Sequence, residues 1–291
     1  MKAAFIGLGV MGYPMAGHLQ RTNGSTTVFN RTTSKAQDWV TEYGGQSAVS
    51  PEQAALNADI VFTCVGNDQD LRSVTVEKHG VLSSLKPGAI LVDHTTASAT
   101  IARELDAACK HKSVHFIDAP VSGGEQGAIN GLLTIMCGGE TADYDKAKPV
   151  MECYTREIRL MGPAGHGQLT KMVNQICIAG LIQSLAEGIH FAENAGLDPL
   201  KVIEIISTGA AQSWQMDNRH ETMVKGEYDH GFAVDWIRKD LAIALEEGRK
   251  NGSHLPIAAL VDQFYSEVQS LGGSRWDTSS LLARLQSLKQ P

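Results

Sequence analysis

Three glycines near the start of the chain constrain its fold more than any other feature. Gly7, Gly9 and Gly12 lie between a short apolar segment, residues 3–6, and a segment of helical character, residues 14–19. A strand, a tight turn and a helix in that order form the context in which a G-x-G-x-x-G pattern binds a dinucleotide. The first glycine allows the turn, the second lets a pyrophosphate approach the backbone, and the third lets the helix pack against the strand. The alternative is a glycine-rich turn that binds no ligand.

Size and charge exclude several classes of protein. The chain has 291 residues, of which 43% are hydrophobic, so it can bury a large core and form two domains. Its net charge is −7 and its basic residues are scattered, which argues against a nucleic-acid surface. No apolar run approaches the length of a membrane span, and the first strand begins too early for a signal peptide to precede it. We expect a cytoplasmic protein with neither nucleic acid nor membrane as a partner.

The cysteines and histidines indicate a reducing compartment and no metal. The five cysteines are odd in number and show no C-x-x-C spacing. They lie mostly in apolar segments, as expected for reduced, buried thiols. The ten histidines form no H-E-x-x-H motif and no cluster with cysteine, so we predict no metal site.

Apolar, strand-like segments alternate with helical segments over the first half of the chain. Strands are predicted at residues 3–6, 26–30, 60–64, 89–93, 114–118, 132–137 and 157–160, with further helices at 34–43, 51–57 and 97–110. Strands that are apolar throughout are buried on both faces, which predicts a parallel sheet covered by helices. The fold class is therefore α/β, with a doubly wound sheet of Rossmann type.

The pattern changes at a cluster of glycine and proline, residues 161–165. From residue 166 to about residue 194 apolar residues recur at helical spacing without a proline. Further helices are predicted at residues 199–207, 232–251, 256–271 and 279–289. We predict a dinucleotide-binding domain at residues 1–163 and an all-helical domain at residues 164–291, joined by the long helix.

Cofactor preference is predicted from the segment after the second strand. NAD-specific sites place an acidic residue about 20 residues after the glycines, where it binds the ribose 2′-hydroxyl. Asn30, Arg31 and Thr32 occupy this place. Asn30 lacks the charge that would repel a 2′-phosphate, Arg31 offers a cation of suitable geometry, and Thr32 adds a hydroxyl. We expect NADP in preference to NAD; the alternative is a solvated Arg31 that opens the next helix.

Two further loops are expected at the same edge of the sheet, because ligands bind at the C-terminal ends of parallel strands. Cys64 and Val65 begin a small, polar loop suited to lie along the cofactor. In the next loop the hydroxyls of Thr95 and Thr96 can reach the nicotinamide or the substrate. The alternative role for Thr96 is the N-cap of the helix predicted from residue 97.

A loop without bulky side chains follows the strand at residues 114–118. Ser122, Gly123 and Gly124 present successive backbone N–H groups and one hydroxyl. Such a concave arrangement binds anions, and a small carboxylate would fit it. An ordinary turn before a helix is the alternative.

The first turns of the long helix contain a glycine, a lysine and an asparagine that could form a site. Gly167, Lys171 and Asn174 are four and three residues apart and therefore share one helical face. The glycine is expected to leave room for a ligand beside the lysine. A partly desolvated lysine can donate a proton or stabilise a developing alkoxide. Alternatively, Lys171 is a surface residue. Further along, on the helix predicted from residue 232, the pattern of Lys239 and Asp240 indicates a helical charge pair.

Four separate motifs follow one another along the chain: GLGVMGYPMA at 7–16, DAPVSGG at 118–124, GHGQLTKMVNQ at 165–175 and RKDL at 238–241. On these motifs the chain resembles the β-hydroxyacid dehydrogenases over essentially its whole length. This group includes 3-hydroxyisobutyrate dehydrogenase, tartronate semialdehyde reductase and glyoxylate/succinic semialdehyde reductase.

The resemblance implies an oxidoreductase that transfers a hydride between a nicotinamide cofactor and a small 3-hydroxy acid or its semialdehyde. It implies that Lys171 is the catalytic acid and base and that Asn174 helps to hold the substrate. It also implies that Ser122, Gly123 and Gly124 bind the substrate carboxylate.

The resemblance also implies cofactor contacts. Thr96 would lie near the nicotinamide and Lys239 would close over the cofactor. The Asn30-Arg31-Thr32 segment is similar to that of the NADP-preferring branch. The whole expected cofactor-binding set is Gly7, Gly9, Val10, Met11, Gly12, Asn30, Arg31, Thr32, Cys64, Val65, Thr96 and Lys239.

Three other functions stay open. Imine reductases share the architecture but generally have another residue in place of Lys171. Non-catalytic, NADP-binding members of the family lack the lysine, whereas this chain has both Lys171 and Asn174. A 6-phosphogluconate dehydrogenase would have a much longer helical domain.

The length of the helix predicted from residue 166 also bears on assembly. It is apolar on more than one face, which is more than a small domain covers. We therefore expect a homodimer or homotetramer built through the helical domain. Trp214, Met216 and Trp236 are candidates to narrow the substrate space, with core or interface packing as the alternative.

Overall fold

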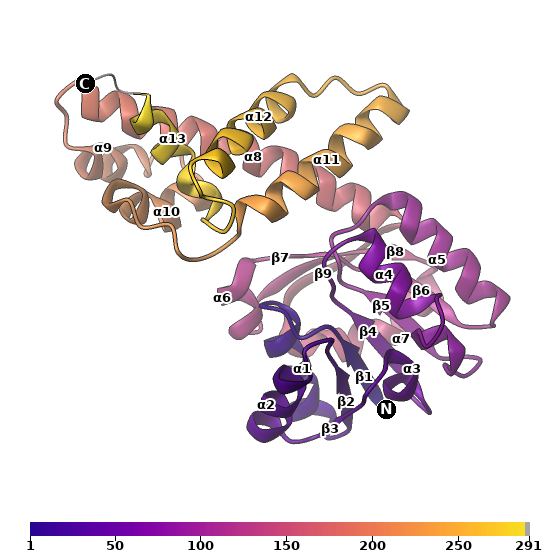
Figure 1. Ribbon diagram of the computed structural model, residues 1–291. Coiled ribbons are helices and arrows are strands. Elements are labelled where there is room, and N and C mark those ends of the chain that lie inside the picture. Colours follow the sequence, from indigo (N-terminus) through magenta and orange to yellow (C-terminus); the bar gives the residue numbers. More distant parts are fainter. Residues whose placement is uncertain (289–291) are drawn as a thin grey trace. The chain divides into compact units, whose positions relative to one another are not determined.

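The computed structural model describes residues 1–288 and divides into two compact units (Figure 1). The N-terminal unit is Met1–Lys171, and the C-terminal unit follows from Met172. The predicted boundary after residue 163 precedes the long helix α8 (His166–Asn194), whereas this division falls within α8.

The N-terminal unit is built on a nine-stranded sheet in the order β3-β2-β1-β4-β5-β6-β8-β7, with β9 beside β8. Pairing is parallel from β3 to β6, which confirms the predicted Rossmann-type sheet. The strands are β1 (Ala3–Ile6), β2 (Thr26–Phe29), β3 (Gln46–Ser47), β4 (Ile60–Thr63), β5 (Ile90–Asp93), β6 (His115–Asp118), β7 (Val121–Ser122), β8 (Leu133–Gly139) and β9 (Thr155–Gly162). The order reverses between β1 and β4, and ligands bind at such a switch point.

One edge of the sheet departs from the predicted parallel arrangement. β8 pairs antiparallel with both β6 and β7, while β9 runs parallel to β8. β7 and β8 are joined through the short helix α6 (Gly124–Ile129), and a connection this short returns the chain in the opposite direction.

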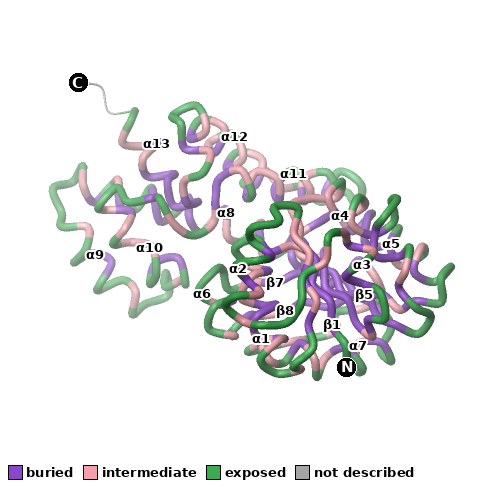
Figure 2. Tube along the Cα trace, turned by 60° about the horizontal axis from the view of Figure 1, so that its bottom comes forward, coloured by how far each residue is buried: buried purple, intermediate pink, exposed green. Residues whose placement is uncertain are grey.

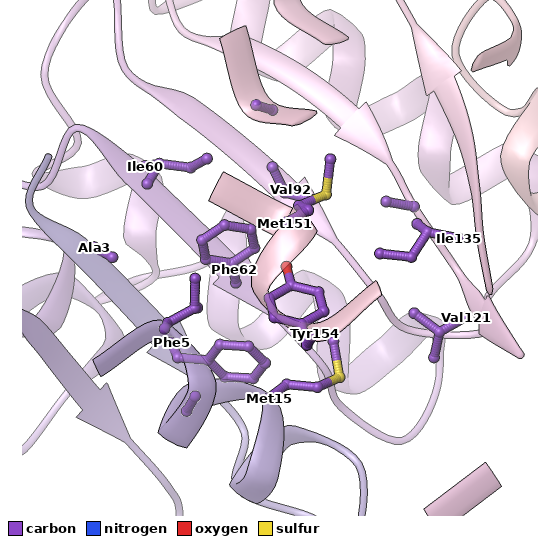
Figure 3. Packing of buried hydrophobic residues seen from close by; sticks show 14 of the residues in the cluster. Ala3, Phe5, Met15, Ile60, Phe62, Val92, Val121, Ile135, Met151 and Tyr154 are labelled. Carbon is purple, nitrogen blue, oxygen red and sulfur yellow. The ribbon is translucent and has the colours of Figure 1, made fainter. Parts of the chain in front are cut away.

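Helices cover both faces of the sheet. They are α1 (Gly12–Asn23), α2 (Thr33–Tyr43), α3 (Pro51–Ala55), α4 (Asp68–Thr75), α5 (Ala99–His111) and α7 (Thr141–Met151), besides α6. Alternate strand residues enter opposite cores: Phe5 and Phe62 pack with Met15 and Tyr154 (Figure 3), while Ile6 packs on the other face. Figure 2 shows the central strands β1 and β5 buried along their length, which explains their wholly apolar sequences.

The helices and strands that the sequence pattern did not predict are short or weakly patterned. β3 and β7 have two residues each. α4 is mostly polar, buries Leu71 and Thr75, and begins where the Asn67 side chain accepts a hydrogen bond from the Asp70 N–H. α7 contains Pro149, which lowers helix propensity.

The C-terminal unit is helical, as predicted. It contains most of α8, then α9 (Pro199–Ile206), α10 (Trp214–Lys225), α11 (Val234–Asn251), α12 (Pro256–Ser270) and α13 (Leu281–Ser287). Among the helices described up to residue 288 in this unit, only α10 was not predicted from the sequence. The last predicted helix begins as a 3-10 turn, Thr278–Ser280, and its expected end at residue 289 lies outside the described residues.

Helix α8 corrects the expectation that no apolar run approaches the length of a membrane span. By length and composition it could span a membrane, with a mean hydropathy of 1.2 over its most apolar window. However, 44% of that window is buried, and Ala179, Ile182 and Ile189 belong to the core of the C-terminal unit. These features are those of the central helix of a helical domain.

Candidate functional site

The glycine turn is as tight as the sequence predicts. Gly7 has φ +100°, and a β-carbon there would collide with the backbone carbonyl of Cys64 at the end of β4. A β-carbon on Gly12 would collide with the Gly7 carbonyl, so α1 packs directly on the turn. The turn therefore brings the ends of β1 and β4 together at the switch point of the sheet.

The segment that follows the turn is open and fits a dinucleotide. A β-carbon on Gly9 would meet no atom within 4 Å, and Val10 is 57% exposed. Met11 is the N-cap of α1, and no side chain caps this helix end. In the first turn of α1 the Tyr13 N–H donates to the Gly9 carbonyl at 3.0 Å and Pro14 has no N–H. The N–H groups of Met11 and Gly12 have no partner within the helix, and together with its dipole they attract a phosphate. Gly7, Gly9, Val10, Met11 and Gly12 could thus hold a pyrophosphate.

The segment after β2 is held by the glycine turn itself. The Asn30 Oδ1 accepts a hydrogen bond from the Leu8 N–H at 2.9 Å, so Asn30 is anchored beside the turn. The Arg31 side chain is 88% exposed, and its Nη1 lies 3.4 Å from an oxygen of Asp70. Thr32 is the N-cap of α2 but makes no side-chain cap bond. An exposed cation and a hydroxyl therefore stand next to the anchored Asn30, where a ribose phosphate could bind.

The loops after β4 and β5 are tied to each other. The Val65 N–H donates to Thr95 Oγ1 at 3.0 Å, and the Ser98 N–H donates to an Asp68 oxygen at 2.9 Å. Thr95 is 1% exposed, so the prediction that its hydroxyl faces a ligand is wrong. Cys64 and Val65 are half-buried at the switch point, next to Gly7.

Thr96 does not cap a helix. α5 begins at Ala99, and Ser98 caps it by accepting a hydrogen bond from the Ile101 N–H at 3.0 Å. The predicted cap was misplaced because the helix starts two residues later than the sequence pattern indicates. Thr96 is half-buried, and its contact with the cofactor stays a prediction.

His94 lies buried in the N-terminal unit. Its ring stacks on Phe62, donates from Nδ1 to the Ala119 carbonyl at 2.6 Å, and accepts at Nε2 from the Tyr154 hydroxyl at 2.9 Å. Burial lowers the pKa of His94 to about 4. The imidazole is therefore neutral near pH 7.

Two carboxyl groups end neighbouring strands beneath these loops. Asp93 and Asp118 are register partners on β5 and β6, and both are buried. Burial raises the pKa of Asp93 to about 7 and that of Asp118 to about 6. Asp93 accepts from the Thr63 hydroxyl at 2.7 Å and from the Thr95 N–H at 3.0 Å, but its second oxygen has no hydrogen-bond partner.

We expect Asp93→Asn to weaken the pH dependence of stability. In the unfolded chain the pKa of Asp93 is near its ordinary value of 3.8, and in the folded protein it is about 7. Its contribution is fully present below about pH 4 and is lost as the pH rises to about 7, a change on the order of a few kcal/mol. Asparagine cannot ionise, so the fall in free energy of unfolding between pH 5 and 8 should be smaller, as urea titrations would show.

The exposed Asp145 provides the control for this measurement. Asp145→Asn removes the same charge from the surface of α7 and should leave the pH dependence as it is in the unmodified protein. Equal pH dependence in Asp93→Asn and the unmodified protein would show that Asp93 ionises in the folded state as it does in water.

Asp118 anchors the first turn of α8 to the sheet. Its Oδ1 accepts from the Gly165 N–H at 2.7 Å and its Oδ2 accepts from the Gln168 N–H at 2.9 Å. A β-carbon on Gly167 would collide with the Met136 carbonyl and with Asp118. The prediction that Gly167 leaves room for a ligand is therefore wrong, because β6 and β8 fill that space.

Lys171 lies one helical turn beyond this anchor. It is 7% exposed, so it is not a surface lysine. Gln168, three residues earlier on the same helical face, is fully buried and bonds to the backbone on both sides of Thr96. The sequence interpretation assigned no role to Asp118 or Gln168, although both belong to its quoted motifs.

The predicted carboxylate loop turns the chain from β7 into α6. Gly123 has φ +130° and Gly124 has φ +64°, so both positions need glycine. Both glycines are exposed, and a β-carbon on Gly124 would meet no atom within 4 Å. The loop therefore offers Ser122 and an accessible backbone to a small ligand.

In the C-terminal unit, a polar chain joins Asn174 to Lys239. Asn174 Nδ2 donates to Gln175 Oε1 at 2.8 Å, and Gln175 Nε2 donates to a carboxylate oxygen of Asp240. Lys239 Nζ lies 3.0 Å from the other oxygen of Asp240. Gln175 and Asp240 are buried, so the pair connects α8 with α11 inside this unit.

The tryptophans and cysteines differ in part from expectation. Trp214 is 52% exposed and Trp236 is 39% exposed, so neither packs in a core, whereas Met216 is buried. Within residues 1–288 none of the five cysteines forms a disulfide, and Cys177 is exposed rather than buried. No group of three or more His, Cys, Asp or Glu within this range could hold a metal ion.

Comparisons with known proteins agree with this architecture. Residues 2–162 match the family model of the NAD-binding domain of 6-phosphogluconate dehydrogenase. Residues 165–285 match the family model described as NAD-binding of NADP-dependent 3-hydroxyisobutyrate dehydrogenase.

Individual relatives extend over nearly the whole chain. An uncharacterized oxidoreductase of Shewanella frigidimarina is 65% identical and covers 98% of both chains. A probable 3-hydroxyisobutyrate dehydrogenase-like protein of Arabidopsis thaliana is 42% identical over 99% of this chain and 86% of its own. The structure of Mycobacterium tuberculosis 3-hydroxyisobutyrate dehydrogenase, solved with L-serine, superposes with a TM-score of 0.89 at 26% identity, covering 98% of this chain and 99% of that one. The chain belongs to the β-hydroxyacid dehydrogenase family and is an NAD(P)-dependent dehydrogenase that acts on CH–OH groups.

Proposed function

We propose that the protein transfers a hydride between NADP(H) and a small 3-hydroxy acid or its semialdehyde, with Lys171 as general acid and base. The observation that carries the proposal is the burial of Lys171 one turn beyond the point where Asp118 and Gln168 hold α8. A lysine in that place is shielded from water, so its charge acts strongly on a nearby oxygen.

In the proposed mechanism one residue of the chain transfers the proton and two others position the reactants. The nicotinamide ring, when bound, supplies or accepts the hydride. In reduction, Lys171 Nζ stabilises the developing alkoxide oxygen and donates a proton to it; in oxidation the same nitrogen removes the hydroxyl proton. Asn174 holds the substrate, and Thr96, near the nicotinamide, keeps the reacting face of that ring in place.

The substrate class follows from the loop at Ser122, Gly123 and Gly124. Exposed backbone N–H groups beside a hydroxyl suit a carboxylate, and a fixed carboxylate determines which face of the neighbouring carbon reacts. L-serine, found with the M. tuberculosis relative, is a small acid of this kind. We place the enzyme in the cytoplasm, with NADP preferred over NAD.

A substrate screen tests the proposal. The oxidation of NADPH and of NADH would be followed by the loss of absorbance of the reduced nicotinamide, with glyoxylate, succinic semialdehyde, tartronate semialdehyde and cyclic imines as substrates. We expect turnover with at least one carboxylate-bearing aldehyde and a preference for NADPH. Activity with imines alone would replace the proposal by an imine reductase, and binding of NADPH without any turnover would favour a scaffold.

We further propose that the protein is a homodimer or homotetramer assembled through the helical unit. Along α8 an exposed stripe repeats every three or four residues: Val173, Cys177, Leu181, Ser184, Gly188 and Phe191. Leu181 is 45% exposed and Phe191 is 71% exposed, and a large uncovered apolar stripe marks an interface. Ile257 on α12, which is 59% exposed, lies where a β-carbon on Gly180 would touch it, and it extends the apolar area.

We expect light scattering to give a mass of two or four chains of 31.3 kDa, and Leu181→Glu to reduce it because a charge cannot be buried unpaired. Lys250→Glu, a charge change on the exposed surface of α11, is the control and should leave the mass unchanged. A monomeric unmodified protein would contradict the proposed assembly.

A further inference from the structure

Gln168 is a buried carboxamide that bonds on both sides of Thr96. Its Nε2 donates to the Thr95 carbonyl at 2.7 Å, and its Oε1 accepts from the Ala97 N–H at 3.0 Å. The side chain is fully buried within the N-terminal unit. One side chain thus joins the start of α8 to two residues that lie 73 and 71 positions earlier in the sequence.

The chemistry of these two bonds requires a carboxamide. The carbonyl of Thr95 only accepts and the N–H of Ala97 only donates, so the side chain between them must do both. A carboxylate would lose the donor, and an apolar side chain would lose both bonds. Each loss leaves a backbone group buried without a partner, which costs more than the bond itself contributes.

The backbone of Gln168 is itself held in place. Asp118 accepts the Gln168 N–H at 2.9 Å and the Gly165 N–H at 2.7 Å, which fixes the first turn of α8 on β6. Lys171 follows three residues later on the same face of the helix. One rigid turn therefore carries the lysine and also grips the segment that contains Thr96.

We propose that Gln168 is a positioning residue for hydride transfer: its carboxamide fixes Thr96 relative to the helical turn that carries Lys171. The inference rests on the proposed roles of those two residues. Because a displacement of about 1 Å can cost on the order of 100-fold in rate, a clamp on both sides of Thr96 has a catalytic consequence.

The clamp itself is tested without catalysis, by amide hydrogen exchange on the full-length protein in the absence of cofactor. Gln168→Met keeps the length of the side chain but removes both bonds. We expect faster exchange at the Ala97 N–H, which has lost its acceptor. Unchanged exchange at Ala97 would overturn the clamp, whatever the activity of the protein.

The catalytic consequence is tested by steady-state kinetics with NADPH deuterated at the transferred position. We expect Gln168→Met to lower kcat about 10- to 100-fold with a smaller effect on the KM for NADPH. The isotope effect on kcat should rise as hydride transfer becomes slower. Gln168→Glu, which keeps the size and the acceptor, provides a second variant if Gln168→Met does not fold, and it should change both quantities in the same direction.

Gln183 provides the matched control. It is also a buried glutamine of α8, and its Nε2 donates to Glu187 Oε1 at 2.6 Å. Gln183→Met should leave kcat, the isotope effect and the exchange of Ala97 unchanged. If both glutamine variants lose stability and neither changes kcat or the isotope effect, Gln168 is only structural and the proposal fails. If the unmodified protein reduces no carbonyl compound, the proposed function fails, while exchange at Ala97 still decides the clamp.

Discussion

Lys171→Ala should lower turnover by about 100-fold or more, the usual scale for losing a general acid and base. The variant should still bind NADPH, because the predicted cofactor residues, apart from Lys239 on α11, lie on the glycine turn and the loops after β2, β4 and β5. Lys171 is buried, and alanine on a helix keeps the backbone of α8 intact. Turnover with the best substrate of the screen and NADPH binding by fluorescence would be measured on the same preparation.

Two further variants separate catalysis from folding. The side chain of Lys201 on α9 is 82% exposed, so Lys201→Ala, the same substitution at a surface lysine, should leave turnover unchanged. Asn174→Ala should raise the KM of the substrate more than it lowers kcat, since Asn174 is proposed to hold the substrate. Near-normal turnover in Lys171→Ala would rule out the mechanism. Loss of NADPH binding together with loss of turnover would point to a folding defect.

The fold could be predicted because its signals are local. Strands β4 and β5 are buried on both faces, which explains why their sequences are mostly apolar. The glycine pattern likewise reports on two close contacts, at Gly7 and Gly12, that only glycine allows. β7 was not predicted, because a strand of two residues has no periodicity to detect.

The support of the site could not be predicted, because it depends on contacts between distant residues. Asp118 and Gln168 lie 50 residues apart, and Gln168 and Thr95 lie 73 residues apart. Nothing in the local pattern indicates that Asp118 will accept the free N–H groups at the start of α8. The same contact explains why Gly167 was misinterpreted: helical spacing places it correctly on the face of Lys171, but only the tertiary structure shows that the sheet fills the space beside it.

Arg31→Asp should reverse the cofactor preference. Hydrogen bonds to a charged group contribute about 1.5–3 kcal/mol, so loss of the guanidinium should weaken NADPH binding about 10- to 100-fold, and the new carboxylate would also repel the 2′-phosphate. The pair between Arg31 and Asp70 is solvent-exposed and adds little stability, so it does not compete strongly for the arginine. NADH should bind as well as before or better, because an acidic side chain can accept hydrogen bonds from the ribose hydroxyls.

The measurement compares dissociation constants and KM values for NADPH and NADH in the same variant. Lys112→Asp makes the same change in net charge at the exposed end of α5 and should affect neither cofactor. Asn30 must stay in place during the test, because its side chain holds the Leu8 N–H and so supports the glycine turn. A KM for NADPH that is unchanged in Arg31→Asp would show that the 2′-phosphate is bound elsewhere or that NAD is the natural cofactor.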